Sequence, residues 1–442
     1  MNNMIEYIIL VVIIAIVFGI LLLVYYKMEC TGGVEHGIKS GSAEIPVELI
    51  KVIKSISKTG KNDRIELPHK DEYQRILESC IDKNLSDYKI NKNSFLDMTN
   101  YLKTNIRYRR RCLQVIIKKG QITYIAPNSK ATIWKRDGVD NRVFTFIRMI
   151  TDLDHWCADN NLMLPECSFV IYVADTYAWE EIAKDLPWFI MAKPINRPGI
   201  LIPDNSFITH GISGDTQHVL TDKKSGNWMW DQLIKKSKSL SFDDSKDELY
   251  FKGANTGTYK FSTRDYLSKY KWDIPVTIDL GNKHESMFNW SKYIGLLNLP
   301  GNQPWSYRLK YLYLLKSPVV NIDVLLRYAE PTDTEKLDID RLDRWIQFFD
   351  HLFIPNKDYI QVSQIYYDNP KLPKFNELKK ESYDRVVDDI KSSYKKIKTD
   401  NMYAENAYKK ISNLSTSRML QFLYVTIVKY ANLLNLTPFT PS

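Results

Sequence analysis

Residues 248–257 read ELYFKGANTG, and this stretch decides the fold. Apolar and aromatic residues over 248–252 predict a strand, and the small residues that follow predict a tight turn. Gly253 and Gly257 let the backbone turn sharply and approach a ligand closely. A strand that ends in such a turn is typical of an α/β unit that binds its ligand at the carboxyl ends of its strands.

Two arginines follow this turn at positions that suit an anion. Arg264 comes shortly after the strand, and Arg308 stands with Ser306 at the head of an apolar helix predicted over 306–315. A guanidinium is a planar fork that matches phosphate oxygens, and a helix start adds free backbone N–H groups. The pattern favours a diphosphate ligand, with a surface salt bridge as the alternative for either arginine.

The rest of the chain alternates predicted helices and strands, which indicates an α/β fold. We expect a hairpin at 112–125 with its turn at Gly120, and a C-terminal region that is helical over 375–434. Further helices are predicted at 46–57, 70–104, 143–160 and 342–352, and further strands at 165–175, 187–193, 199–203, 276–280, 293–297 and 318–322.

Asp175 is the candidate general base. It ends the apolar, β-branched run 165–175, and the carboxyl end of a buried strand is where α/β proteins bind ligands. Apolar walls would raise the pKa of its carboxyl group and make it a better base. The alternative is a helix N-cap.

Two Asp-x-Asp strings raise the question of a metal. Asp152 with Asp154, and Asp338 with Asp340, match the spacing that metal-dependent sugar transferases use. Both strings lie in predicted helices among other charges, so we expect solvated faces and no metal ligand.

Composition and cysteine spacing bear on the class of function. The net charge is +9, but 61 basic residues are interspersed with 52 acidic ones, so we expect no nucleic-acid partner. The densest basic run, 107–111, fits a solvated element end or a contact with an anionic surface. The five cysteines form no C-x-x-C pair and predict no zinc ribbon, although disulfides among Cys80, Cys112, Cys157 and Cys167 stay open.

Residues 7–26 carry no charge and consist mainly of Ile, Leu and Val. A helix of this length covers about 30 Å, the thickness of the bilayer's hydrocarbon core. Its bulky end favours an uncleaved single-pass anchor over a signal peptide. Lys27 on its C-terminal side favours a cytosolic body, which leaves the orientation open.

In order and spacing, the motifs around 250–360 resemble those of glycosyltransferase family 90. This is the group of capsule-associated xylosyltransferases, KDEL-motif protein O-glucosyltransferases and lipopolysaccharide-modifying relatives. The residues that carry the resemblance are Phe251-Lys252-Gly253-Ala254, Thr256, Arg264, Lys292-Tyr293, Ser306-Tyr307-Arg308-Leu309-Lys310, Lys316-Ser317, Phe348-Phe349, Pro355 and Asp358-Tyr359.

The resemblance implies a GT-B fold, in which two Rossmann-like domains face a cleft. It implies an inverting transferase that moves glucose or xylose from a UDP-sugar to a hydroxyl group of a protein or glycan, with no cofactor and no metal. It also implies a type II protein with a luminal catalytic domain. The residues that would bind the donor are Lys252, Gly253, Ala254, Thr256, Arg264, Ser306, Arg308 and Phe349.

Four residues depart from the family pattern. Lys252 stands for Arg, Ala254 for Ser, Lys316 for Gly and Asp358 for His. These changes leave donor identity open and motivate an alternative, a catalytically inactive transferase fold that serves as a membrane-bound binding or structural protein.

Together these features predict the following division of the chain: an anchor at 1–27, a stem at 28–60, an acceptor-side α/β domain at 61–240, a nucleotide-sugar-binding α/β domain at 241–385, and a helical tail at 386–442 that packs back. The abundance of Lys, Asn, Ile and Tyr is typical of an AT-rich genome, viral or protist.

Overall fold

The computed structural model describes residues 49–54, 67–91, 93–105, 111–126, 139–174, 186–209, 228–241, 246–255, 263–281, 285–301, 304–327, 344–367, 370–371, 374–400 and 402–434. All of them belong to one unit, Val47–Ser442. The predicted anchor, Asp175, Thr256 and the Asp338 string lie outside the described residues.

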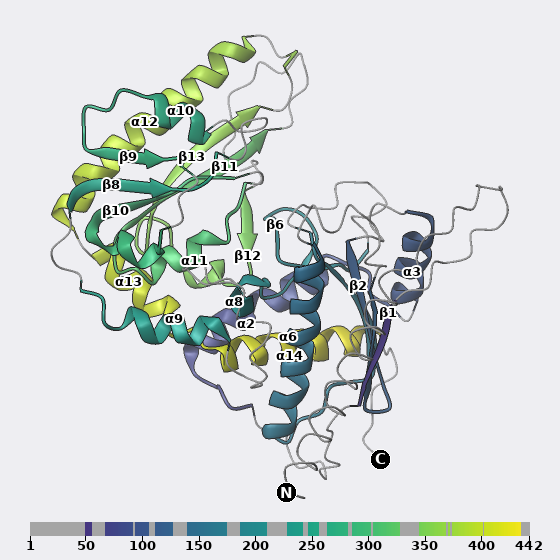
Figure 1. The fold of residues 1–442 in the computed structure, drawn as a ribbon. Helices are drawn as coiled ribbons and strands as arrows, with labels where there is room; N and C mark the ends of the chain where they lie inside the picture. Colours follow the sequence, from purple (N-terminus) through teal and green to yellow (C-terminus); the bar gives the residue numbers. More distant parts are fainter. Residues whose placement is uncertain are drawn as a thin grey trace, which may run out of the picture. The chain divides into compact units, whose positions relative to one another are not determined.

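Five strands of the described chain form a sheet in which every pairing is parallel (Figure 1). Their order is β13 (Ile360–Tyr367), β11 (Val319–Arg327), β10 (Tyr293–Asn298), β8 (Lys246–Lys252) and β9 (Val276–Asp279). The predicted strands at 248–252, 276–280, 293–297 and 318–322 are confirmed, as is the α/β class. Because all five run the same way, their carboxyl ends meet at one edge.

Helices cover both faces of this parallel sheet. Leu249 and Phe251 share a core cluster with Ile390 of α12 (Phe375–Thr399), and Leu267 of α10 (Thr263–Lys269) joins them. Tyr250, whose side chain points the other way, belongs to the cluster that contains α11 (Arg308–Tyr313). Burial on both faces is what a parallel sheet requires.

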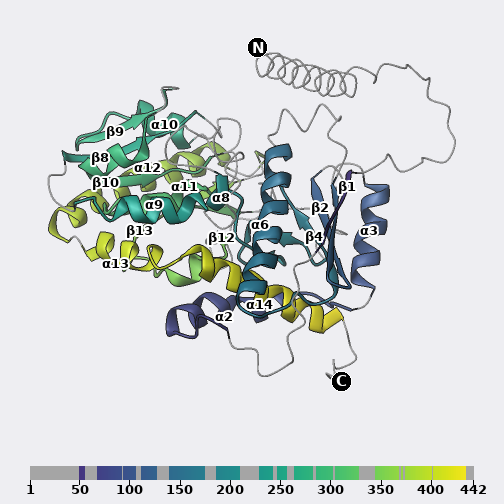
Figure 2. The ribbon, with the colours of Figure 1, turned by 60° about the horizontal axis from the view of Figure 1, so that its bottom comes forward.

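A second sheet of the described residues has six strands and mixed direction. Its order is β1 (Leu49–Lys54), β3 (Gln121–Ala126), β2 (Cys112–Lys118), β4 (Cys167–Tyr172), β5 (Phe189–Ile190) and β7 (Ile200–Leu201). The pairs from β1 to β4 are antiparallel and the last two are parallel. Helices α3 (Ser94–Thr104) and α6 (Val139–Asp159) lie on opposite faces (Figures 1 and 2). The predicted hairpin at 112–125 is confirmed.

Three element predictions are wrong. The predicted helix at 46–57 is the edge strand β1, whose backbone pairs with β3 from Leu49↔Ala126 to Lys54↔Gln121. The predicted helix at 342–352 is β12 (Trp345–Gln347), followed by the 3-10 turn η4 (Asp350–Leu352). In both cases a distant strand takes up the backbone hydrogen bonds, since β12 pairs with β6 (Ala192–Pro194).

The third is the single helix predicted at 70–104, which is two helices, α2 (Glu72–Ser86) and α3. Between them Asn91 Oδ1 accepts from Asn93 N at 2.8 Å, and Ser94 Oγ accepts from Asn91 N at 2.9 Å. Such local side-chain bonds compete with helix continuation.

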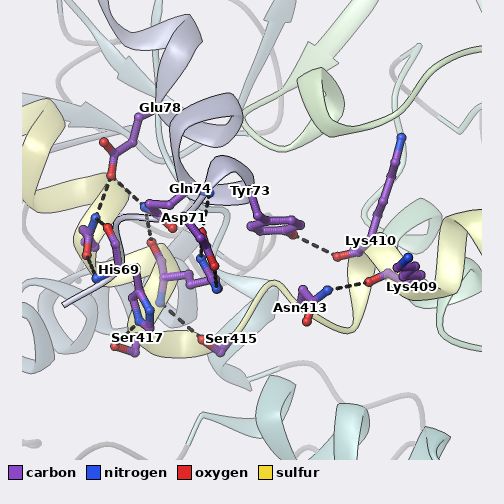
Figure 3. A network of polar contacts seen from close by, with 12 residues as sticks. His69, Asp71, Tyr73, Gln74, Glu78, Lys409, Lys410, Asn413, Ser415 and Ser417 are labelled. Atoms are coloured by element: carbon purple, nitrogen blue, oxygen red, sulfur yellow. Dashed lines mark hydrogen bonds and ion pairs between the residues drawn. The ribbon is translucent and has the colours of Figure 1, made fainter. Parts of the chain in front are cut away.

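The helical region at 375–434 is confirmed as α12, α13 (Met402–Ile411) and α14 (Thr416–Leu434). Polar contacts join the last two to the start of α2 (Figure 3). Gln421 Oε1 accepts from His69 N at 2.9 Å, and Arg418 Nη1 donates to Asp71 Oδ1 at 2.7 Å. The remaining elements are α8 (Ser206–Thr209), α9 (Met229–Ser237) and the 3-10 helix η2 (Met287–Lys292).

No helix among the described residues is long and apolar enough to cross a membrane. Cys80, Cys112, Cys157 and Cys167 are buried free thiols, so the possibility of disulfides among them is excluded. Burial raises the pKa of the Cys80 and Cys167 thiols to about 12, which makes them unreactive at neutral pH.

Candidate functional site

Two guanidinium groups lie over the ring of Phe251 at the carboxyl end of β8. Arg264 Cζ is 5.1 Å from the ring centroid and Arg308 Cζ is 4.8 Å from it. Gly253 makes this arrangement possible, because a Cβ atom there would lie 2.7 Å from Arg308 Nη2 and 3.0 Å from the Phe251 ring. The structure therefore brings together three of the residues that the sequence assigned to donor binding. We call Gly253, Arg264 and Arg308 the arginine site.

Arg264 connects the ends of two neighbouring strands. Its Nη1 donates to Ala254 O at 2.7 Å and its Nη2 donates to Leu299 O at 3.2 Å. Only 5% of its surface is exposed, and this burial lowers its pKa to about 10. It stays charged at neutral pH and holds the turn after β8 against the end of β10.

Arg308 carries a charge that no described carboxylate neutralises by an ion pair. Its Nη1 is buried without a hydrogen-bond partner among the described residues. Burial, and then repulsion from Arg264, lowers its pKa to about 9. Two like charges near one ring would be stabilised by an anion between or beside them.

A buried ion pair lies two residues further along α11. Lys310 Nζ donates to Asp204 Oδ2 at 2.8 Å and to Ser206 Oγ at 2.6 Å, and both charged side chains are at most 1% exposed. Ser306 Oγ accepts from Arg308 N at 3.1 Å, so Ser306 caps the first turn of α11. The helix predicted over 306–315 is shorter, Arg308–Tyr313.

The other predicted donor-binding residues have different surroundings. Lys252 Nζ forms an ion pair with Asp279, and Ala254 contributes its carbonyl oxygen to Arg264. Phe349 is 0% exposed and packs among Phe207 and Phe353 in the core. We therefore assign Phe349 a packing role. Thr256 and Asp175 lie outside the described residues, although Val173 and Ala174 at the end of β4 are buried.

A polar pocket lies next to the arginine site, at the carboxyl end of β10 and beside the middle of β11. The volume of the pocket, including the part open to solvent at its mouth, is about 550 Å³. Its inner part is much smaller, with about 30 Å³ available to the centre of a water molecule. Ser306, which caps Arg308, also lines it. The other lining residues used below are Asn298, Trp305, Asn321, Asp323, Arg344, Trp345, Gln347, Asp350 and Tyr359.

Two carboxyl groups of this polar pocket have raised pKa values. Burial raises the pKa of Asp323 to about 6, against the opposing charge of Arg344. Burial, reinforced by Asp323, raises the pKa of Asp350 to about 7. Paired carboxyls that titrate near neutrality can exchange protons with a ligand, and such groups gather at functional sites.

Sequence reasoning did not find this polar pocket. A signal was present in β11, where Asn321 and Asp323 interrupt an otherwise apolar strand on the same face. No such signal in the sequence marks Gln347 and Asp350, because the pattern over 342–352 predicts a helix.

The Asp-x-Asp string at 152–154 also differs from prediction. Asp152 and Asp154 are buried, not solvated, and Asp152 Oδ2 accepts from Trp228 Nε1 at 2.8 Å. The expectation of a solvated face is wrong here because a distant Trp takes the carboxylate into the core. Within the described residues no group of three or more His, Cys, Asp or Glu side chains is arranged to hold a metal ion.

Two of the residues that differ from the motifs this sequence resembles, Lys316 and Asp358, have well-defined surroundings. Lys316, in the place of Gly, has a φ of 58°, the left-handed conformation that glycine adopts most easily. Asp358, in the place of His, is 1% exposed and accepts from Lys410 Nζ at 2.6 Å and from Ile354 N at 2.5 Å. In this chain Asp358 joins the loop before β13 to α13.

Comparisons of the chain with protein-family models and with curated proteins find no match.

Proposed function

We propose that this chain is an inverting glycosyltransferase that uses a UDP-sugar, with glucose or xylose as the donor sugar and a hydroxyl group of a protein or glycan as the acceptor. The observation that carries the proposal is Arg308, a buried guanidinium with no described carboxylate in an ion pair and with a second guanidinium beside it. A diphosphate would supply a negative charge for Arg308.

The proposed reaction is a single displacement. The acceptor oxygen forms a bond to the anomeric carbon while the bond from that carbon to the β-phosphate oxygen breaks. Asp175 takes the acceptor proton, and the electron pair leaves with UDP, whose developing charge Arg264 and Arg308 stabilise. A GT-B arrangement would bring Asp175, three residues after β4 in the sequence, to the same cleft. The anchor at 7–26 would place the enzyme on a membrane, with a luminal body.

A specific observation supports the alternative of an inactive fold. The Lys252 ammonium, in the place of the family's Arg, is already paired with Asp279. One cation fewer faces a donor, which weakens leaving-group stabilisation while Arg308 can still bind an anion.

The test is binding and hydrolysis of a panel of UDP-sugars by the full-length chain, with and without a chelator. We expect one UDP-sugar to bind and to release UDP slowly, and Arg308→Ala to weaken binding by about 10- to 100-fold, as expected for loss of a charged hydrogen bond. Arg308→Lys should weaken it less. Gly253→Ala should weaken it too, because the new methyl group displaces Arg308 Nη2.

Arg75→Ala is the matched control, since Arg75 is an exposed arginine on α2. It should leave binding unchanged. Binding without turnover would favour the inactive fold, and a folded protein that binds no UDP-sugar would refute the proposed donor.

A further inference from the structure

The polar pocket contains a row of side chains whose orientations fix one another. Asn298, Asn321 and Gln361 are neighbours across β10, β11 and β13. Asn321 Nδ2 donates to Asp323 Oδ1 at 2.7 Å, and Gln361 Nε2 donates to Asp323 Oδ2 at 2.7 Å. Asn298 Nδ2 then donates to Asn321 Oδ1 at 2.7 Å.

This order has a consequence for what the polar pocket presents. An ionised Asp323 can only accept, so Asn321 must turn its NH₂ group toward it and its oxygen toward Asn298. Asn298 in turn must direct its NH₂ group at Asn321. Its Oδ1 is therefore left over, and it is buried with no hydrogen-bond partner in the described chain.

A second acceptor repeats the pattern on the other wall. Gln347 Oε1 is also buried and has no partner among the described residues. Asn298 and Gln347 are 5% and 2% exposed, and both line the polar pocket. A buried acceptor left unsatisfied costs about 1–3 kcal/mol, so two of them at one pocket indicate a ligand with at least two donors.

The space and the surrounding side chains narrow the chemistry of that ligand. The inner part, with about 30 Å³ open to the centre of a water molecule, has room for about two or three water-sized groups. The carboxyl groups of Asp323 and Asp350 add acceptors, while Arg344 offers a donor. Trp305 and Trp345 line the pocket and provide flat surfaces of the kind on which sugar rings stack. Two adjacent hydroxyl groups on one ring meet all of these conditions.

We infer that the polar pocket binds the vicinal hydroxyl groups of a sugar ring, with the amide oxygens of Asn298 and Gln347 as the acceptors that require them. The inference rests on the proposed function of the arginine site. Ser306 caps Arg308 of the arginine site and also lines the polar pocket, and a nucleotide sugar would occupy both sites. The hydroxyl pair belongs either to the ribose or to the sugar that is transferred.

The experiment measures, by tryptophan fluorescence, the affinities of the full-length chain for a UDP-sugar, for UDP and for 2′,3′-dideoxy-UDP. If the transferred sugar occupies the polar pocket, the UDP-sugar binds about tenfold more tightly than UDP, the value of one or two hydrogen bonds. If the ribose occupies it, dideoxy-UDP binds about tenfold more weakly than UDP. In either case Gln347→Leu should reduce that difference, because one of the two acceptors is lost, and Gln347→Glu, which keeps an acceptor, should retain it.

Asp82→Asn is the control, because Asp82 is an exposed carboxylate paired with Lys429 on α14. If nucleotide binding depends on Arg308 but neither hydroxyl difference exists, or Gln347→Leu leaves it intact, the inference is overturned and the proposed function survives. If no nucleotide binds, the proposed function fails, and free glucose, xylose and ribose at high concentration become the probes. A fluorescence change that Gln347→Leu removes would then support the inference, and its absence would overturn it.

Discussion

In the six-stranded sheet the buried side chains are almost all apolar or aromatic, whereas three strands of the parallel sheet carry a row of amides and a carboxyl group. Among β2, β3, β4, β5 and β7, the strands of this six-stranded sheet whose side chains are described, Gln114 is the buried polar exception. In the parallel sheet, Asn298, Asn321 and Gln364 are all at most 5% exposed. Buried polar groups cost stability unless they are fully hydrogen-bonded. We infer that the six-stranded sheet mainly builds the hydrophobic core, whereas the parallel sheet also supports the candidate site.

The largest effect should come from cutting into the apolar sheet. Phe169 is 0% exposed and packs against Phe189, with ring centroids 4.6 Å apart. Phe169→Ala should lower the free energy of unfolding by about 3–5 kcal/mol, because it leaves a cavity. Urea unfolding gives this value. If the comparison holds, the affinity of the folded variant for a UDP-sugar stays that of the wild type; a matching loss of affinity would contradict it.

A smaller effect should come from the two carboxyl groups of the polar pocket, Asp323 of β11 and Asp350 of η4. The folded pKa values of Asp323 and Asp350, about 6 and about 7, lie above their ordinary value of 3.8. Between roughly pH 4 and pH 7 the unfolded chain therefore loses protons that the folded chain keeps, so stability falls as pH rises.

The double variant Asp323→Asn/Asp350→Asn isolates this contribution. Its stability relative to the wild type should increase from pH 4.5 to pH 7.5, measured by urea unfolding at each pH. If the difference in unfolding free energy between the double variant and the wild type does not change with pH, the two carboxyl groups have ordinary pKa values. The two sheets would then not differ in the electrostatics of their buried side chains.

The smallest effect concerns the hairpin of the mixed sheet. Lys119 and Gly120, at its turn, have φ values of 50° and 66°. Asn tolerates this left-handed conformation better than Lys, and Asn-Gly is the favoured pair in such turns. Lys119→Asn should therefore stabilise the fold by about 1 kcal/mol or less. Lys118→Asn, one residue earlier in β2, should not stabilise it; equal gains would show that the turn is not the cause.

The sequence predicted those features that depend on neighbours along the chain. The alternation at 112–118 with the Gly120 turn specified a hairpin, and the apolar run before Gly253 specified β8. Gly253, Arg264 and Arg308, which the sequence assigned to one ligand, lie together around the Phe251 ring, and their shared role stays a prediction. β1 and β12 failed because their partners, β3 and β6, lie far away in sequence. Asp152 failed for the same reason, because its burial depends on Trp228.

The polar pocket shows the same limit. The acceptor of Asn298 is left over only because Asp323 orders two amides on different strands, and such a relay exists only once the register is known. No local sequence pattern specifies the register in which β10, β11 and β13 pair. What could be read was the interruption of an apolar strand by Asn321 and Asp323.

The contacts between α2 and α14 also order events in time. His69 and Gln421, which are hydrogen-bonded to each other, are 352 residues apart. At a synthesis rate of about 5–20 residues per second, the ribosome needs roughly 20–70 s to pass from one to the other. During that interval the buried face of α2 lacks the partner that covers it. Because α14 is made long after α2, nascent-chain chaperones have this interval in which to bind the apolar face of α2.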